Sequence, residues 1–175
     1  MHEGPDTIRV SIQVFNDVTI LWRSMVELLR HALTGDQLCL VGLPEVLAGL
    51  TLPANMAVPD RSRLAAVLGA PEVPARIGGS EPLVCRCGAA VPGHWRASGR
   101  LTADFDWMDQ LLREKLIRHA LGGDVLLLVC ATGAEQHAQA GRILLRHGRH
   151  NLQTHEFTLR GSRAGKGEDQ SPKKE

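Results

Sequence analysis

Three side chains that can bind metal or carry redox chemistry lie close together in the middle of the chain. Cys85 and Cys87 are separated by a single residue, and His94 follows shortly after them. Two thiolates and an imidazole are ligands that zinc prefers, and Cys39 or Cys130 could supply a fourth. The spacing Cys-x-Cys differs from the Cys-x-x-Cys of most structural zinc sites. In an extended segment it places both sulfurs on one face, which also suits a redox pair.

Two interpretations of this segment stay open. In the first, Leu83–Cys87 is a short strand or loop whose cysteines are incidental, and the protein holds no metal and no cofactor. In the alternative, Cys85, Cys87 and His94 form a zinc-binding or redox-responsive centre. We favour the first interpretation because the spacing is poor for tetrahedral zinc.

The four cysteines are expected to be reduced thiols. The chain begins with MHEGPDT, which lacks the basic and then apolar segments of an export signal, so we expect a cytoplasmic protein. Cys39 and Cys130 lie within apolar strand candidates, where a free cysteine behaves as a small hydrophobic residue. We therefore expect these two thiols to resist alkylation and Cys85 and Cys87 to react quickly.

A second group of candidate residues is basic and surrounds the end of the last predicted helix. Such cations complement the helix dipole and could contact an anion or a partner. The net charge of the chain is only +1 and its aromatic content is 3%, so no nucleic-acid partner is indicated. We interpret the group as a solvated face. Its members are Arg142, Arg146, His147, Arg149, His150 and His155.

Two copies of one pattern must position these residues, and each copy reads as strand, amphipathic helix, turn and strand. The first helix carries an apolar stripe with a period of 3.6 residues, which is typical of a helix packed on a sheet. Asn16 or Asp17 is placed to cap it, and Gly35 to end it. The predicted segments are Ile8–Phe15, Asp17–Thr34 and Gln37–Gly42 in the first copy, and Val125–Ala131, Ala134–His147 and Asn151–Leu159 in the second.

The remaining segments divide the chain into one domain and a tail. Residues 1–160 form a single predicted domain, with an irregular insertion at about 43–101 that is rich in proline and glycine. A helix is predicted at about 102–121. Residues 161–175 are polar and without periodicity, which predicts a disordered tail. No apolar run is long enough to cross a membrane, which favours a soluble protein.

The order β-α-β, insertion with helix, β-α-β predicts an α/β (α+β) sandwich of the ferredoxin-like class. Ile8–Phe15 and Val125–Ala131 are expected to be adjacent, parallel central strands. Both repeat helices should cover one face of the sheet, burying Trp22 and Leu144. The other face is expected to be bare, and a partly polar surface made by Ser11, Gln13 and Val14 would suit a homodimer.

The repeats also resemble a known family. The segment GGDVLLLVCATGAEQHAQAGRILLRHG resembles the closing unit of the small bacterial general-stress, heat-induced α/β domains. The segment RVSIQVFNDVTILWRSMVELLRHALTGD is similar to their opening strand and helix. The resemblance covers both repeats and implies a non-enzymatic, stress- or envelope-related accessory domain. It carries over no functional residue.

We expect no enzymatic activity, because no nucleophile stands in a context such as Gly-x-Ser-x-Gly. The expected function is that of a non-catalytic accessory or stress-related protein that associates with a protein partner or with itself, as a homo-oligomer. Peripheral membrane association stays open. The alternative is a metal- or redox-responsive protein that uses Cys85, Cys87 and His94, with zinc as its cofactor.

Overall fold

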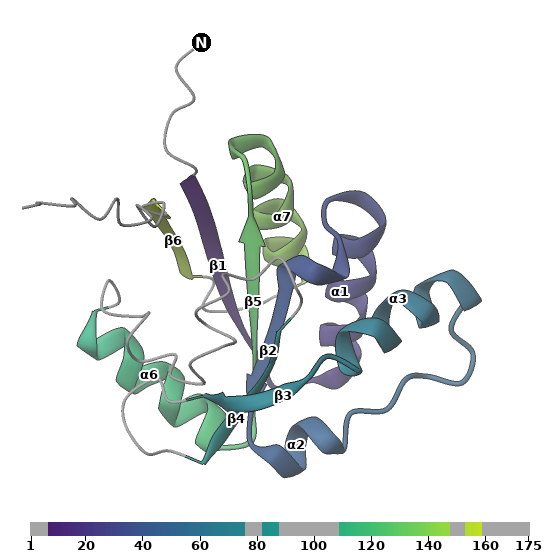
Figure 1. Ribbon diagram of the computed structural model, residues 1–175, viewed down its shortest axis with the longest axis horizontal. Coiled ribbons are helices and arrows are strands. Elements are labelled where there is room, and N and C mark those ends of the chain that lie inside the picture. Colours follow the sequence, from purple (N-terminus) through teal and green to yellow (C-terminus); the bar gives the residue numbers. More distant parts are fainter. Residues whose placement is uncertain (1–6, 76–81, 88–108, 148–152, 159–175) are drawn as a thin grey trace, which may run out of the picture.

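The computed structural model describes residues 7–75, 82–87, 109–147 and 153–158 (Figure 1). Both predicted repeats are present as strand, helix and strand. The predicted tail at 161–175 lies outside the described residues, as do positions 102–108 of the predicted third helix. The elements are β1 Thr7–Phe15, α1 Val18–His31, η1 Gly35–Gln37, β2 Leu38–Gly42, α2 Pro44–Ala48, α3 Val58–Leu68, β3 Glu72–Ala75, β4 Leu83–Cys87, α6 Gln110–Leu121, β5 Val125–Ala131, α7 Ala134–His147 and β6 Gln153–Thr158.

The strands form one sheet in the order β3-β4-β2-β5-β1-β6. β1 and β5 are central neighbours, as predicted, but they pair antiparallel, so the predicted parallel orientation is wrong. The reason lies in how the two repeats interleave. β5 pairs antiparallel with both β1 and β2, and β1 pairs antiparallel with both β5 and β6. Each β-α-β unit therefore crosses over one strand of the other unit, and neighbouring strands run in opposite directions.

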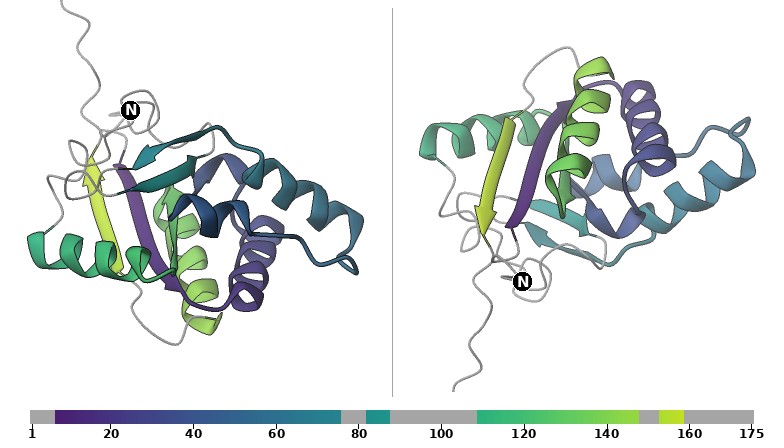
Figure 2. Two further views of the ribbon diagram at one scale, coloured as in Figure 1. Left: turned by 90° about the horizontal axis from the view of Figure 1, so that it is seen from below. Right: turned by 90° about the horizontal axis from the view of Figure 1, so that it is seen from above.

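Helices cover both faces of the sheet. α1 and α7 lie side by side on one face (Figure 2), and Trp22 and Leu144 are buried in the same cluster there, as predicted. α6 lies on the opposite side of the central strands (Figure 1), where Leu116 and Ala120 pack against residues of β1, β2, β4 and β5. Every residue of β2 and β5 is buried. The predicted bare face is therefore wrong for the centre of the sheet.

The predicted polar surface on β1 is also wrong. Ser11 and Gln13 are each only 1% exposed. They alternate with Val10 and Ile12, which face α6, and so lie on the face that α1 and α7 cover. Val14 packs, half-buried, against the α6-side cluster. Because successive strand residues point to opposite faces, these three side chains cannot form one dimer surface.

The described part of the insertion, residues 43–75 and 82–87, is not irregular, which corrects the prediction there. It contains α2, α3, β3 and β4, and the rest of the predicted segment 43–101 lies outside the described residues. The prediction was wrong because the prolines of this segment were interpreted as residues that interrupt helices and strands. Pro44 and Pro59 instead stand at the first turns of α2 and α3, where the missing N–H has no helical partner to lose. Pro74 lies in β3, an edge strand of the described sheet, where a missing ladder donor is tolerated.

The predicted N-cap of α1 is confirmed, whereas its predicted C-terminal end is wrong. The Asp17 carboxylate accepts hydrogen bonds from the N–H of Thr19, at 2.8 Å, and of Ile20, at 3.3 Å, so Asp17 is the N-cap. The helix ends at His31, well before Gly35, which instead opens the short helix η1. Among the described glycines only Gly123 has a positive φ, so Gly35 is no left-handed stop.

Candidate metal and redox centre

Two neighbouring strands bring three cysteines together. In β4, Leu83, Cys85 and Cys87 are buried while the residues between them are half-buried, so both sulfurs point to the same face, as predicted. β2 pairs antiparallel with β4 in a register that sets Cys39 opposite Cys87 and Val41 opposite Cys85. The sulfur atoms of Cys39, Cys85 and Cys87 all lie within 4.8 Å of one another.

Cys39 and Cys87 form a disulfide, with their Cα atoms 4.1 Å apart. The expectation of four reduced thiols is therefore wrong for this pair. The physical reason is long-range, because the two residues are 48 positions apart and meet only through the register of β4 on β2. From the sequence, Cys39 and Cys130 were equal candidates for a further ligand. In the fold, Cys39 is the one that lies beside Cys85 and Cys87.

Cys85 is a free thiol beside this disulfide. Burial raises the pKa of Cys85 to about 12, and the negative charge of Glu72 adds to the shift. Arg86 holds Glu72 nearby through an ion pair of 3.3 Å and donates to the Leu68 carbonyl at 2.7 Å, which ties β3 and the end of α3 to β4. Cys85 is therefore protonated at neutral pH, and a protonated thiol is a poor nucleophile toward the adjacent disulfide.

The predicted difference in alkylation rates is not supported by the burial of the cysteines. Cys85 is 0% exposed and Cys87 is 3% exposed, close to the 0% of Cys39 and the 2% of Cys130, and the disulfide leaves neither Cys39 nor Cys87 as a free thiol. Their apolar surroundings explain the burial, since all four belong to the cluster between the sheet and α6. His94, the third residue of the predicted centre, lies outside the described residues.

Alkaline pH should destabilise the protein through its buried thiols. Burial raises the pKa of Cys130 to about 12, whereas an unfolded cysteine titrates near pH 8.5. The folded chain keeps this proton when the unfolded chain has lost it, so the stabilisation is complete below about pH 8.5 and is lost as the pH rises toward 12. Between these values one thiol contributes a slope of about 1.4 kcal/mol per pH unit. Urea unfolding of Cys130→Ala between pH 8 and 11 should show a flatter decline than the wild type, and parallel curves would contradict this pKa.

The basic group at the end of α7 is partly neutralised within the fold. Arg146 and His147 both pair with Glu27 of α1. The hydrogen bond with His147 is the main cause that holds the pKa of Glu27 below its usual value. Arg142 is exposed. Arg149 and His150 lie outside the described residues, and nothing is described of the side chain of His155. These contacts join α1 to α7, and the interpretation of the group as a solvated face stays a prediction.

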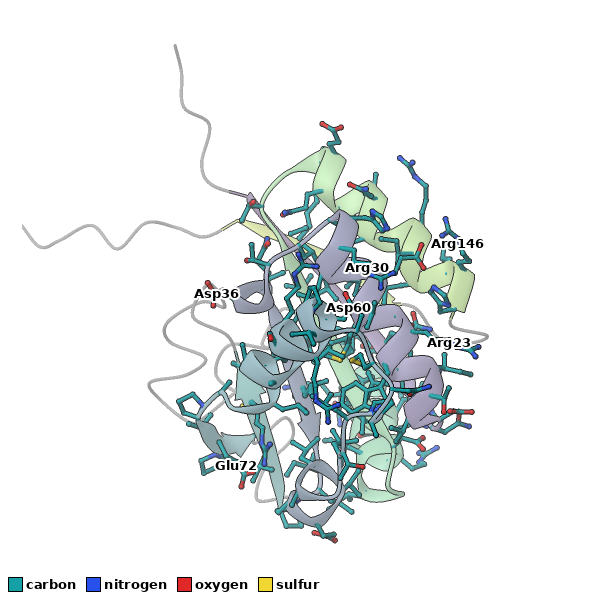
Figure 3. All side chains as sticks on the ribbon, turned by 90° about the vertical axis from the view of Figure 1, so that its right-hand side faces the viewer. Arg23, Arg30, Asp36, Asp60, Glu72 and Arg146 are labelled. Atoms are coloured by element: carbon teal, nitrogen blue, oxygen red, sulfur yellow. A yellow bond between two sulfur atoms is a disulfide. The ribbon has the colours of Figure 1, made fainter. Side chains whose placement is uncertain are left out.

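A surface groove of about 560 Å³ lies between α1, the segment before α3, and α3 itself. Trp22, Val26 and Met56 supply its apolar lining. Its acidic residue, Asp60, pairs with Arg30 of α1, as Figure 3 shows. This hydrogen bond, with the charge of Arg30, holds the pKa of Asp60 below its usual value, so the carboxylate is ionised and already occupied.

Comparison with known proteins finds no matching family model, no matching curated protein and no matching solved structure. The resemblance to general-stress domains stays a prediction. Within the described residues, no helix has the length and apolarity needed to span a membrane. The three-sulfur group of β2 and β4 is the arrangement with the most specific chemistry in the described part of the chain.

Proposed function

We propose that this protein is a non-catalytic, redox-responsive accessory protein whose switch is the Cys39–Cys87 disulfide. The observation that carries the proposal is the register of β4 on β2, which sets the two cysteines opposite each other with a third sulfur within 4.8 Å. This proposal follows the redox-responsive alternative that was inferred from the sequence. It differs in one residue, since Cys39 takes the place of His94 beside Cys85 and Cys87.

The disulfide joins the insertion to the core of the sheet. Cys39 lies in β2, which pairs with the central strand β5, whereas Cys87 ends β4, which carries β3 at the edge of the described sheet. In the oxidised state the bond fixes β4 in register. In the reduced state, four register pairs with β2 and the contacts of Arg86 hold β4 in place. The redox state thus sets how firmly the insertion is held.

The switching reaction is a thiol–disulfide exchange with a low-molecular-weight disulfide, RSSR. The Cys39 and Cys87 thiols lose two hydrogens in total, the Cys39–Cys87 bond forms, and RSSR is reduced to two RSH. The reverse reaction consumes two RSH. Because both sulfurs are almost fully buried, each direction requires local opening of β4 together with its edge neighbour β3. The protonated Cys85 thiol protects the disulfide against internal reshuffling at neutral pH.

The proposal predicts one specific disulfide that follows the applied redox potential. Full-length protein is equilibrated with defined ratios of oxidised and reduced glutathione, quenched in acid, denatured and alkylated. Mass spectrometry should show two thiols fewer in the oxidised protein, and peptide mapping should join Cys39 to Cys87. Amide exchange in β3 and β4 should be faster in the reduced protein, because these strands are then held by non-covalent contacts alone.

Cys130→Ser is the matched control for this titration. Cys130 is buried in the same cluster but lies outside the three-sulfur group, so its loss should leave the oxidation of the other thiols unchanged. Cys39→Ser should abolish the two-thiol difference. Four alkylated thiols at every glutathione ratio in the wild type would rule out the switch.

We also propose that β6-β1-β5-β2, with α1 and α7, forms a ferredoxin-like core to which β4 and β3 are added. The strand order and the two crossovers support this assignment. Association with a partner protein, or with a second copy of the chain, is the output that we assign to the switch. Its expected site is the β3–β4 edge, whose attachment changes with the redox state.

A further inference from the structure

The three sulfurs of β2 and β4 have a second use once the disulfide is reduced. We propose that the reduced cluster of Cys39, Cys85 and Cys87 binds one thiophilic divalent cation of the zinc class. This inference rests on the proposed function, because the same reduction that opens the disulfide frees two of the three ligands.

The geometry of the cluster fits the size of the cation. Zinc binds thiolate sulfur at about 2.3 Å, so two sulfurs at a tetrahedral angle stand roughly 3.8 Å apart. With the Cys39–Cys87 disulfide formed, the three sulfurs already lie within 4.8 Å of one another, and reduction lets the bonded pair move apart to the spacing that the cation needs. Cys85 and Cys87 approach from one strand and Cys39 from the next, so small side-chain rotations are enough to close the site.

The chemistry of the site selects a soft cation. Among the described residues, no histidine or carboxylate joins the group, so the ligand atoms present are sulfur only. Thiolate ligands favour zinc and other thiophilic ions over magnesium or calcium. The charge also favours a divalent ion. Three thiolates leave a net charge of −1 around a divalent ion and −2 around a monovalent one, and burial in an apolar cluster penalises the larger charge.

Binding requires that the thiols lose their protons. The balanced step is M²⁺ with three Cys-SH giving a tris-thiolate complex and three H⁺, without any change of oxidation state. Cys85 is fully buried, and a bound cation supplies the positive charge that a buried thiolate otherwise lacks. The fourth position of a tetrahedral ion is left to a ligand beyond these three residues.

Zinc titration of the full chain tests this inference. The protein is reduced anaerobically with a phosphine, and Zn²⁺ is added in competition with a chromophoric chelator in weakly buffered solution at pH 7. We expect about one Zn²⁺ per chain and the release of about three protons, one from each cysteine of the group. Cd²⁺ should give the ultraviolet charge-transfer band of cadmium thiolates at the same stoichiometry.

Cys85→Ser separates this inference from the proposed function. It removes one ligand but neither partner of the disulfide, so it should lose stoichiometric zinc binding and still form the Cys39–Cys87 bond, which also reports that the variant folds. Cys130→Ser should bind zinc as the wild type does. Absence of stoichiometric zinc in the reduced wild type, or undiminished binding by Cys85→Ser, would overturn the metal site alone. Zinc binding without any disulfide formation would instead overturn the redox switch alone.

Discussion

Reduction of the Cys39–Cys87 disulfide should lower the free energy of unfolding by about 4 kcal/mol, because the bond closes a loop of 48 positions in the unfolded chain. A cross-link of this length removes many conformations from the unfolded ensemble, and the folded sheet already holds the two residues opposite each other. Most of the effect therefore acts through the unfolded state.

This prediction can be measured by urea unfolding at pH 6, with and without a phosphine reductant. At that pH unfolded thiols stay protonated, so exchange with Cys85 or Cys130 is slow. Wild type and Cys130→Ala should both lose stability on reduction. The double variant Cys39→Ala, Cys87→Ala should not respond to the reductant at all. Equal midpoints for oxidised and reduced wild type would show that the bond adds no stability.

Replacing Leu28 by alanine should destabilise the protein by about 2–5 kcal/mol. Leu28 is 0% exposed and lies in the cluster that α1 forms with the sheet and α7. The substitution removes buried methyl groups and leaves a cavity that closely packed neighbours cannot fill. The change in unfolding free energy is measured by urea or thermal unfolding of the oxidised protein.

Leu145→Ala is the matched control. Leu145 lies on α7 and is 64% exposed, so the same substitution there should change stability by no more than about 0.5 kcal/mol. Comparable losses for the two variants would mean that the apolar stripe of α1 does not face the core.

The local elements of this protein could be predicted from the sequence because their signals are local. β5 and α7 begin and end at the predicted residues, Val125–Ala131 and Ala134–His147. The continuous apolar run of β5 and the apolar stripe of a helix can both be recognised from residues that are close together in the sequence. Asp17 likewise caps α1 by contacts within the first turn of that helix. Burial of Trp22 and Leu144 also followed from those stripes.

Residues whose structural role depends on tertiary contacts were predicted less well. Pro44 and Pro59 lie in the first turn of a helix, and Pro74 lies in an edge strand. A proline that interrupts a helix or strand differs from these only in its position within the element. Ser11 and Gln13 were assigned to a surface because they are the polar residues of β1, alternating with Val10 and Ile12, and only the packing of helices on both faces of the sheet decides their burial.

The sequence by itself determined two strand–helix–strand repeats, a Cys-x-Cys pair on one face of an extended segment, and a choice of Cys39 or Cys130 beside it. The tertiary structure alone decided that β1 and β5 run antiparallel and that Cys39 faces Cys87. The reason is physical. Side-chain periodicity fixes which face a residue takes, whereas strand direction and register are set by contacts between segments far apart in the chain. A shift of β4 by two residues would keep every face and still move Cys87 away from Cys39.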